Sequence, residues 1–422
     1  MNLMSDATSI NSVWDRRRRL TLGVIGIAQL MIVLDVTVMN IALPSAQHAL
    51  RFTTVDRQWV VTAYTLTFGS LLLLGGRLAD LLGRKTTFLA GLAGFAVVSA
   101  IGGASVSFAM LITARACQGA FAALLVPSAL SLLTTTFTEP NDRAKAFGIY
   151  GAIAGAGGAI GLLLGGALTE YLSWRWTLYV NLIFASVAFT GGALLLARQP
   201  SLVKPRLDIP GALLVSSAVF CLVYGCSNAA THTWATPSTY GFLAAGLVLG
   251  VGFAAWQGRA AHPLLPPRVV LDRNRGGAYL SIFIGTAGLF GTFLFLTYYL
   301  QQTLGYSPLV TGVAFLPISG GLIVMANLST IVLMPRFGPK PLVALGMLAA
   351  SGGAAWLAQL GPHTVYATGV LGPLILAGIG MGMVIAPMIN TGTFSVPPKT
   401  RERPPRPSPS ARCSAARSAP RC

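Results

Sequence analysis

Two ionisable residues lie inside long apolar runs of the sequence. Asp35 lies in LDVTVMNIALP, together with Asn40, and Arg115 lies in ITARACQGA. A charge in the core of a bilayer costs roughly 2.5–3.5 kcal/mol on insertion scales, so each such residue indicates a functional site. An aspartate can bind and release a proton, and an arginine beside it favours the ionised form. The two residues therefore predict a pair that couples proton movement to the movement of another solute.

A simpler explanation stays open for both residues. Each lies toward one end of its apolar run, where a charged side chain can extend to the membrane interface or tether two helices. Neither of these roles needs a proton to move.

The composition indicates that membrane helices position these residues. Of the 422 residues 54% are hydrophobic and only 9% are charged, whereas roughly a quarter are charged in an ordinary soluble domain. The sequence contains no HExxH, CxxC or GxSxG motif, so it predicts no enzyme, no metal and no cofactor. Three cysteines, Cys117, Cys221 and Cys226, lie in apolar runs and are expected to be buried as small hydrophobic residues.

Apolar stretches long enough to cross a bilayer recur about every 30 residues and number about twelve. The predicted fold class is therefore an all-α polytopic membrane protein. The expected spans are Leu20 to Ala42, Val60 to Gly76, Thr87 to Ala104, Ala109 to Thr134, Ala146 to Leu168, Thr177 to Ala197, Ile209 to Ala229, Tyr240 to Trp256, Ala278 to Tyr299, Val310 to Leu333, Leu342 to Leu360 and Val365 to Ile389.

The basic residues alternate between the connections in a way that sets the orientation. Up to residue 397, one set of connections holds 18 Lys and Arg and the other set holds 3. Basic residues stay on the cytoplasmic side, so the N-terminus is expected to be cytoplasmic, in a multi-pass protein of the inner (cytoplasmic) membrane. The net charge of +18 is accordingly not a sign of nucleic-acid binding.

The sharpest local motif is GRLADLLGRKTTF at residues 76–88, between the second and third spans. Its motif residues are Gly76, Asp80, Gly83, Arg84 and Lys85. The run resembles the cytoplasmic gate loop of the major facilitator superfamily, and departs from it at Leu81, where a basic residue is usual. A similar but weaker pattern recurs at Met334 to Lys340, which suggests an internal repeat.

Further motifs resemble the 14-helix drug:proton antiporters of that superfamily. Asp35 lies in a run similar to their first-helix motif, and Arg115 with Gln118 resembles their fourth-helix motif, where the arginine is implicated in proton coupling. Leu162 stands where the antiporter pattern has proline. The glycine positions of the antiporter motif in the fifth span are Gly148, Gly157, Gly161, Gly165 and Gly166.

The resemblance implies proton-coupled efflux of drugs or other amphipathic small molecules by alternating access, and hence antibiotic resistance. Because Asp35 offers a buried negative charge, the substrate is expected to be amphipathic or cationic. Protons, the small-molecule substrate and the lipid bilayer would be the partners, with no nucleic acid. Asp35, Arg115, Asn40 and Gln118 would serve coupling or substrate binding, the loop motif would stabilise one conformation at the gate, and the glycines would support sliding. Two alternatives stay open: an inactive truncated transporter product, and a related carrier that takes up a small solute.

Four segments are expected along the chain. Residues 1–200 would form a six-helix bundle, 201–265 a two-helix insert and 266–397 an incomplete bundle of four helices. Residues 398–422 are rich in Arg, Pro and Ser and are expected to be a disordered tail. A basic tail that contacts anionic lipid would explain this composition. A frameshift that truncates a 14-helix protein is the favoured explanation, because a shifted reading of suitable codons for Lys399 to Pro405 resembles the family's own segment.

Overall fold

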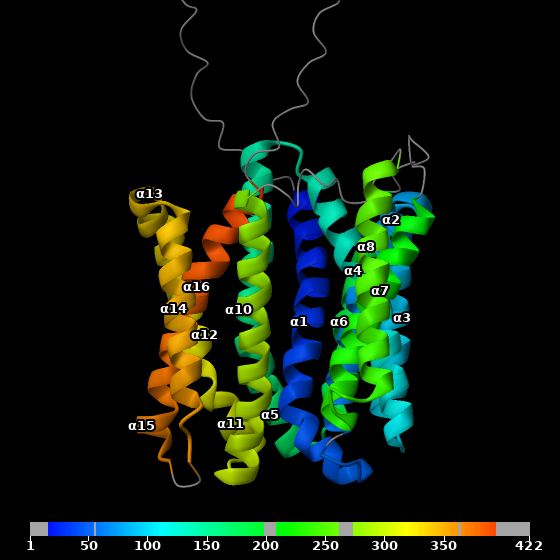
Figure 1. Ribbon diagram of the computed structural model, residues 1–422. Helices are drawn as coiled ribbons and strands as arrows, with labels where there is room; N and C mark the ends of the chain where they lie inside the picture. Colours follow the sequence, from blue (N-terminus) through cyan, green and yellow to red (C-terminus); the bar gives the residue numbers. More distant parts are fainter. Residues whose placement is uncertain (1–15, 55, 198–207, 261–272, 362–363, 394–422) are drawn as a thin grey trace, which may run out of the picture.

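The computed structural model describes residues 16–54, 56–197, 208–260, 273–361 and 364–393 (Figure 1). These residues are almost entirely helical, and they contain no strand. Within these ranges, twelve helices or helix groups are long and apolar enough to cross a membrane. The structure thus confirms the predicted fold class and the number of spans, while the tail at 398–422 lies outside the described residues.

The N-terminal half contains six long helices, which are followed by a pair. Pro44 lies inside the first helix without ending it, and Pro140 begins the fifth, where its missing N–H is not needed. The helices are α1 (Arg16–Leu50), α2 (Arg57–Leu82), α3 (Arg84–Gly103), α4 (Phe108–Thr136), α5 (Pro140–Tyr171), α6 (Trp176–Leu195), α7 (Ile209–His232) and α8 (Pro237–Arg259).

The C-terminal half is built from shorter pieces that form four crossings. Ser307 caps the start of α11 by accepting a hydrogen bond from the N–H of Val310 at 3.3 Å. The pieces are α10 (Arg273–Tyr298), η1 (Tyr299–Thr303), α11 (Pro308–Ala314), α12 (Leu316–Leu328), η2 (Ser329–Leu333), α13 (Met334–Phe337), α14 (Pro339–Leu357), α15 (Tyr366–Gly369) and α16 (Leu371–Thr393).

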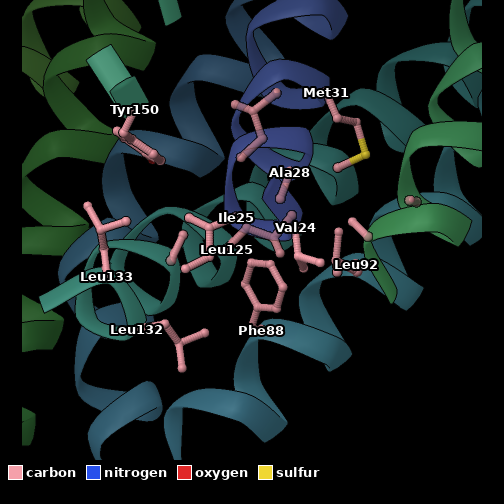
Figure 2. Packing of buried hydrophobic residues seen from close by; sticks show 14 of the residues in the cluster. Val24, Ile25, Ala28, Met31, Phe88, Leu92, Leu125, Leu132, Leu133 and Tyr150 are labelled. Atoms are coloured by element: carbon pink, nitrogen blue, oxygen red, sulfur yellow. The ribbon is translucent and has the colours of Figure 1, made fainter. Parts of the chain in front are cut away.

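The helices of the N-terminal half pack around α1 and α4. α1 lies along α5 and α6, α4 lies along α2 and α3, and α3 also contacts α6. Figure 2 shows part of the apolar core, in which Phe88 of α3 packs among residues that include Ile25 of α1 and Leu125 of α4. In the C-terminal half, α16 packs against both α12 and α14.

The pair α7 and α8 packs on the N-terminal half through α2. Ser216 donates to the carbonyl of Ser70, Gln58 donates to the carbonyl of Ser227 at 3.4 Å, and the Trp59 and Tyr224 rings lie 5.6 Å apart. These contacts are spread along α2 and α7, and α8 packs on α7, so the pair extends the N-terminal half as a further layer beside α2.

Asp208 joins α7 to α8, at the point where α7 begins and α8 ends. Its carboxylate accepts from Trp256 Nε1 at 2.7 Å, Gln257 Nε2 at 2.8 Å and the N–H of Gly211 at 2.9 Å. Burial alone would raise the pKa of Asp208, but these three donors and the charge of Arg77 hold that pKa below its usual range. Arg77 belongs to α2, so the charge of this carboxylate is also favoured by the neighbouring helix.

The expectation for the cysteines is wrong. Cys226 is exposed, and Cys117 and Cys221 are half-buried. The outer face of a membrane helix is as apolar as its inner face, so apolar neighbours in the sequence do not distinguish a core position from one that faces lipid.

Close packing of α2 on α4 gives a first prediction. A Cβ at Gly75 would lie against the carbonyl of Ala123, with the carbonyl carbon 2.7 Å away, whereas a Cβ at Gly151 would meet nothing within 4 Å. Gly75→Leu should therefore destabilise the protein by at least about 1–3 kcal/mol. Thermal unfolding in detergent measures this. Gly151→Leu is the control, and equal melting temperatures for the two variants would contradict the prediction.

Candidate functional site

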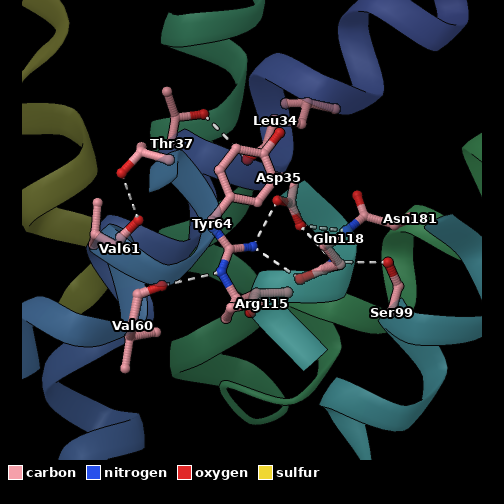
Figure 3. Close-up of polar contacts among 12 residues, drawn as sticks. Leu34, Asp35, Thr37, Val60, Val61, Tyr64, Ser99, Arg115, Gln118 and Asn181 are labelled. Atoms are coloured by element: carbon pink, nitrogen blue, oxygen red, sulfur yellow. Dashed lines mark hydrogen bonds and ion pairs between the residues drawn. The ribbon is translucent and has the colours of Figure 1, made fainter. Parts of the chain in front are cut away.

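A buried ion pair joins α1 to α4 in the middle of the N-terminal half. Arg115 Nη1 lies 2.6 Å from Asp35 Oδ2, and each residue is only 1% exposed (Figure 3). Neither side chain extends to an interface, whereas the pair does tether α1 to α4, so the second of the two simpler roles stays open beside proton coupling. The sequence placed both residues in the membrane, and the fold brings them into direct contact.

Two side-chain amides complete the hydrogen bonding of the carboxylate. Gln118 Nε2 donates to Asp35 Oδ1 at 3.1 Å, and Asn181 Nδ2 donates to the same oxygen at 2.7 Å. Gln118 also donates to Ser99 Oγ at 2.8 Å and accepts from Arg115 Nη1 at 3.0 Å. The carboxylate therefore faces one positive charge and two neutral donors, which is the arrangement that a buried charge requires.

Arg115 is also held by α2. Its Nε donates to the carbonyl of Val60 at 3.4 Å, and its guanidinium carbon lies 4.5 Å from the centre of the Tyr64 ring. Gly119, one turn after Arg115, permits this approach, because a Cβ there would collide with Thr67 Oγ1 and the carbonyl of Tyr64. We name the group Asp35, Ser99, Tyr64, Arg115, Gln118 and Asn181 the Asp35 cluster.

The sequence identified three members of the Asp35 cluster and missed the other three. Ser99, Tyr64 and Asn181 come from α3, α2 and α6, and each is at most 3% exposed. A polar residue within a predicted span was the available signal, and Asn181 in the apolar run NLIFASV gives it most clearly. Asn40 is also buried in α1, but it is not among the hydrogen-bond partners of Asp35.

The loop motif forms a tight turn at the end of α2. Gly83 has a φ of +90°, which residues with a side chain rarely adopt. Lys85 then donates to the carbonyls of Ala193 and Leu196 at 2.7 and 2.6 Å, at the C-terminal end of α6. The negative end of a helix dipole favours a cation there.

The other residues of the loop motif lie close to this turn. Asp80 and Arg84 are half-buried beside it, and Gly76 packs against Pro127 of α4.

Four of the five predicted α5 glycines lie where another helix approaches closely. Gly157, Gly161 and Gly165 face α1, and Gly166 faces the start of α11, where a Cβ would lie 2.6 Å from the carbonyl oxygen of Pro308. Gly148 has open space around it, so the structure does not group it with the others. α5 runs as one helix through Leu162, at the position where the resemblance leads one to expect proline.

The two halves meet at the end of the molecule opposite the loop motif (Figure 1). The N–H of Leu309 donates to Glu170 at 3.0 Å, and Gln301 donates to the carbonyl of Ile41 at 3.1 Å. Gly312 of α11 approaches the carbonyl of Leu162 on α5. Ile41 and Leu162 share an apolar cluster with residues of the C-terminal half. This end is therefore closed by backbone contact between α5 and α11.

The membrane helices form two groups, which contact each other at one end, and one group contains a buried charge pair. This architecture is typical of secondary transporters. The family model described as the Major Facilitator Superfamily matches residues 25–403. The chain belongs to this family.

Three relatives of this chain are named as resistance or export proteins. The chain is 49% identical to the puromycin resistance protein pur8 of Streptomyces alboniger over 386 residues, which covers 91% of this chain and 76% of the relative. It is 40% identical to the cephamycin export protein CmcT of Amycolatopsis lactamdurans, covering 88% and 77%. The tetracenomycin C resistance and export protein of Streptomyces glaucescens is 35% identical, covering 89% and 69%.

Two solved structures share the fold. A bacterial homologue of the human lysosomal transporter Spinster, in an inward-facing and unoccupied conformation, matches with a TM-score of 0.59 at 17% identity, covering 90% of this chain and 75% of that one. The peptide transporter POT in complex with sulfate matches with a TM-score of 0.64 at 15% identity, covering 88% and 82%. Together with the relatives, these matches identify a multi-pass membrane transporter and not an enzyme.

The Asp35 cluster gives a second prediction. Arg115→Ala leaves the Asp35 carboxylate buried without its positive partner, which should cost about 3–5 kcal/mol of stability. Adding Asp35→Asn to that variant removes the unpaired charge and should restore a large part of the loss. Thermal unfolding of the two single variants and the double variant measures the coupling. A double variant that is as unstable as the sum of the single variants would contradict it.

Proposed function

We propose that the protein exports an antibiotic-like, amphipathic small molecule across the cytoplasmic membrane in exchange for protons. The single observation that carries the proposal is the ion pair of Asp35 and Arg115, buried among membrane helices. The similarity to three proteins named for antibiotic resistance or export supports the direction of transport and the class of cargo.

In this proposal Asp35 binds the transported proton. Protonation would remove the negative charge that Arg115 faces at 2.6 Å, so the guanidinium would lose its charge partner inside the membrane. Arg115 would then have to rely on the carbonyl of Val60, the Tyr64 ring and Gln118. A proton on Asp35 would thus weaken the link between α1 and α4, and this link would couple protonation to helix movement.

We infer that the cargo is apolar or amphipathic and cationic. Among the described membrane spans, Asp35 is the acidic residue that is fully buried, and it offers the counter-charge for which a cation and a proton would compete. Gln118 could contact the same cargo as Asp35, and Asn40 could contact it farther along α1. Such competition would let a cationic drug displace a proton, and a proton displace the drug.

Alternating access requires that the closed end can open. We propose that residues 1–200 and 266–397 act as the two moving halves, and that α7 and α8, within 201–265, move with the first half through α2. The α5 glycines would provide the sliding contact, and the loop motif at Gly76 to Lys85 would stabilise one conformation at the cytoplasmic side, where the N-terminus would also lie.

Export by this mechanism gives a third prediction. Asp35→Asn should abolish efflux of a cationic dye that depends on a proton gradient, because the variant has no carboxyl group to bind the proton. Efflux from energised cells or inverted vesicles measures this, after equal amounts of protein in the membrane have been confirmed. Glu139→Gln, which changes an exposed carboxylate at the start of α5, should retain transport. Normal efflux by Asp35→Asn would remove Asp35 from the mechanism.

The closed end gives a fourth prediction. Gly166→Val places a side chain against α11 and should disfavour closure by about 1–3 kcal/mol, which is enough to shift a two-state population about tenfold. Spin labels at Tyr171 and Val310, both exposed, should report a longer separation by pulsed electron resonance. Gly158→Val, also on α5 but with nothing within 4 Å of its Cβ, is the control. Identical distance distributions in both variants would exclude α5 and α11 as the closing contact.

A further inference from the structure

One polar atom of the Asp35 cluster has no hydrogen-bond partner among the described residues. This atom is Oδ1 of Asn181, which is buried and accepts no hydrogen bond. The whole residue is 0% exposed on α6. Buried polar atoms in native proteins are nearly always paired, because an unpaired one destabilises the fold. An unpaired acceptor beside the buried ion pair therefore calls for an explanation.

The other end of the same amide is bonded to the carboxylate. Asn181 Nδ2 donates to Asp35 Oδ1 at 2.7 Å, and Oδ1 of Asn181 points away from it (Figure 3). This orientation suits an ionised carboxylate, which can only accept hydrogen bonds. A half-turn of the amide about its Cβ–Cγ bond would exchange donor and acceptor. The turned amide fits the same space, because its nitrogen and oxygen are similar in size.

Protonation reverses what the carboxylate needs from its neighbours. A proton that binds to Asp35 Oδ1 forms an O–H bond with a lone pair of that oxygen, and no other covalent bond breaks. The proton comes from water through the exchange proposed above. The new hydroxyl group is a donor that faces other donors. A neighbour must then offer an acceptor, because an unpaired hydroxyl group is unfavourable inside the bundle.

The other two donors to the carboxylate cannot offer an acceptor. Arg115 lies 2.6 Å from Asp35 Oδ2, and a guanidinium group has only N–H donors. Gln118 has an acceptor, but that oxygen already accepts from Arg115 at 3.0 Å, while its Nε2 also donates to Ser99 Oγ at 2.8 Å. A half-turn of Gln118 would place its NH2 group against the guanidinium group. Of the three donors, only Asn181 can turn without breaking a second hydrogen bond.

The charge around Asp35 stays constant while this bond changes. The titratable groups that face it are Arg115 of α4 and Tyr64 of α2. Among the other helices packed on α1, α6 contributes Asn181 and α5 contributes the glycines described above. α10 has no charge among residues 276–298, and α11 has no titratable residue. Protonation of Asp35 therefore acts on its hydrogen bonds and on its attraction to Arg115.

We propose that Asn181 turns its side-chain amide when Asp35 is protonated, so that Asn181 Oδ1 accepts a hydrogen bond from the new hydroxyl group. Asn181 is then a positioning residue for the bound proton. The turn adds no unpaired group, because the amide has one bonded end and one free end in both states. The contact between α1 and α6 is thereby kept, and Arg115 of α4 is the partner that protonation releases. This inference rests on the proposed function in one respect, which is that Asp35 binds a proton.

Infrared difference spectroscopy of the full chain in lipid bilayers, between high and low pH, tests the proposal. The C=O stretching band of protonated Asp35 is identified by its loss in Asp35→Asn. Asn181→Leu has a side chain of similar size without polar atoms, so it should shift the Asp35 band to higher frequency, as expected for an O–H group without an acceptor. Asn327→Leu is the control and should leave the band in place. Asn327 is exposed on α12 and donates to the carbonyl of Ile323 in its own helix.

A second measurement needs no substitution at residue 181. Asparagine that is isotopically labelled at the side-chain carbonyl is incorporated into the unmodified chain. Its amide C=O band should move to lower frequency when Asp35 is protonated, because Oδ1 of Asn181 changes from unpaired to hydrogen-bonded. The same shift should be absent from Asp35→Asn. This measurement decides the question if Asn181→Leu does not fold.

Two outcomes would overturn the role of Asn181 alone. One is an Asp35 band at the same frequency in the unmodified chain and in Asn181→Leu. The other is a labelled amide band that does not move while Asp35 takes up its proton. Absence of any Asp35 carboxyl band over the whole pH range would contradict proton binding itself, and the proposed function would fail together with this inference.

Discussion

The arrangement of the N-terminal half depends on one constraint, which is that the charge of Asp35 must be satisfied inside a membrane. A buried ion pair is stable only when its geometry is close and the remaining donors and acceptors are filled. Here Arg115, Gln118 and Asn181 all reach the carboxylate, at 2.6, 3.1 and 2.7 Å. These residues, with Ser99 and Tyr64, come from α1, α2, α3, α4 and α6. Any displacement of one of these helices would expose or unpair a charge, so the cluster fixes their positions relative to one another.

The contact between the halves is of a different kind. α5 approaches α11 through glycine and backbone, and the hydrogen bonds from Leu309 to Glu170 and from Gln301 to the carbonyl of Ile41 need no buried charge. Breaking such a contact costs little beyond packing and two hydrogen bonds, each worth about 0.5–1.5 kcal/mol. The contact between the halves is thus held by weaker interactions than the Asp35 cluster, as the proposed movement between two conformations requires.

Much of this architecture could be predicted from the sequence, because a bilayer leaves few alternatives for an apolar run of sufficient length. Asp35 and Arg115 could also be identified from the sequence, because a charged residue within such an apolar run must lie inside the membrane. Asn181 and Ser99 could not, because a single amide or hydroxyl is common in membrane helices and only the fold shows which one faces the carboxylate. For Cys226 the sequence predicted burial and the structure shows exposure, because apolar neighbours do not show whether a helix face meets lipid or protein.

The unequal halves are physically compatible because the membrane itself is apolar. In water, the exposed apolar side chains of α10 would be driven toward any apolar partner, but lipid tails are as apolar as Leu280 or Phe283, so hydrophobic burial does not operate there. Helices on such a face are held by packing and by the few hydrogen bonds they make. α16 can therefore hold α12 and α14 together while α10 keeps one side against lipid. The same reasoning explains why α1, whose charge requires neighbours, packs against α4, α5 and α6, whereas α10, with no charge among residues 276–298, keeps exposed apolar side chains such as Phe283.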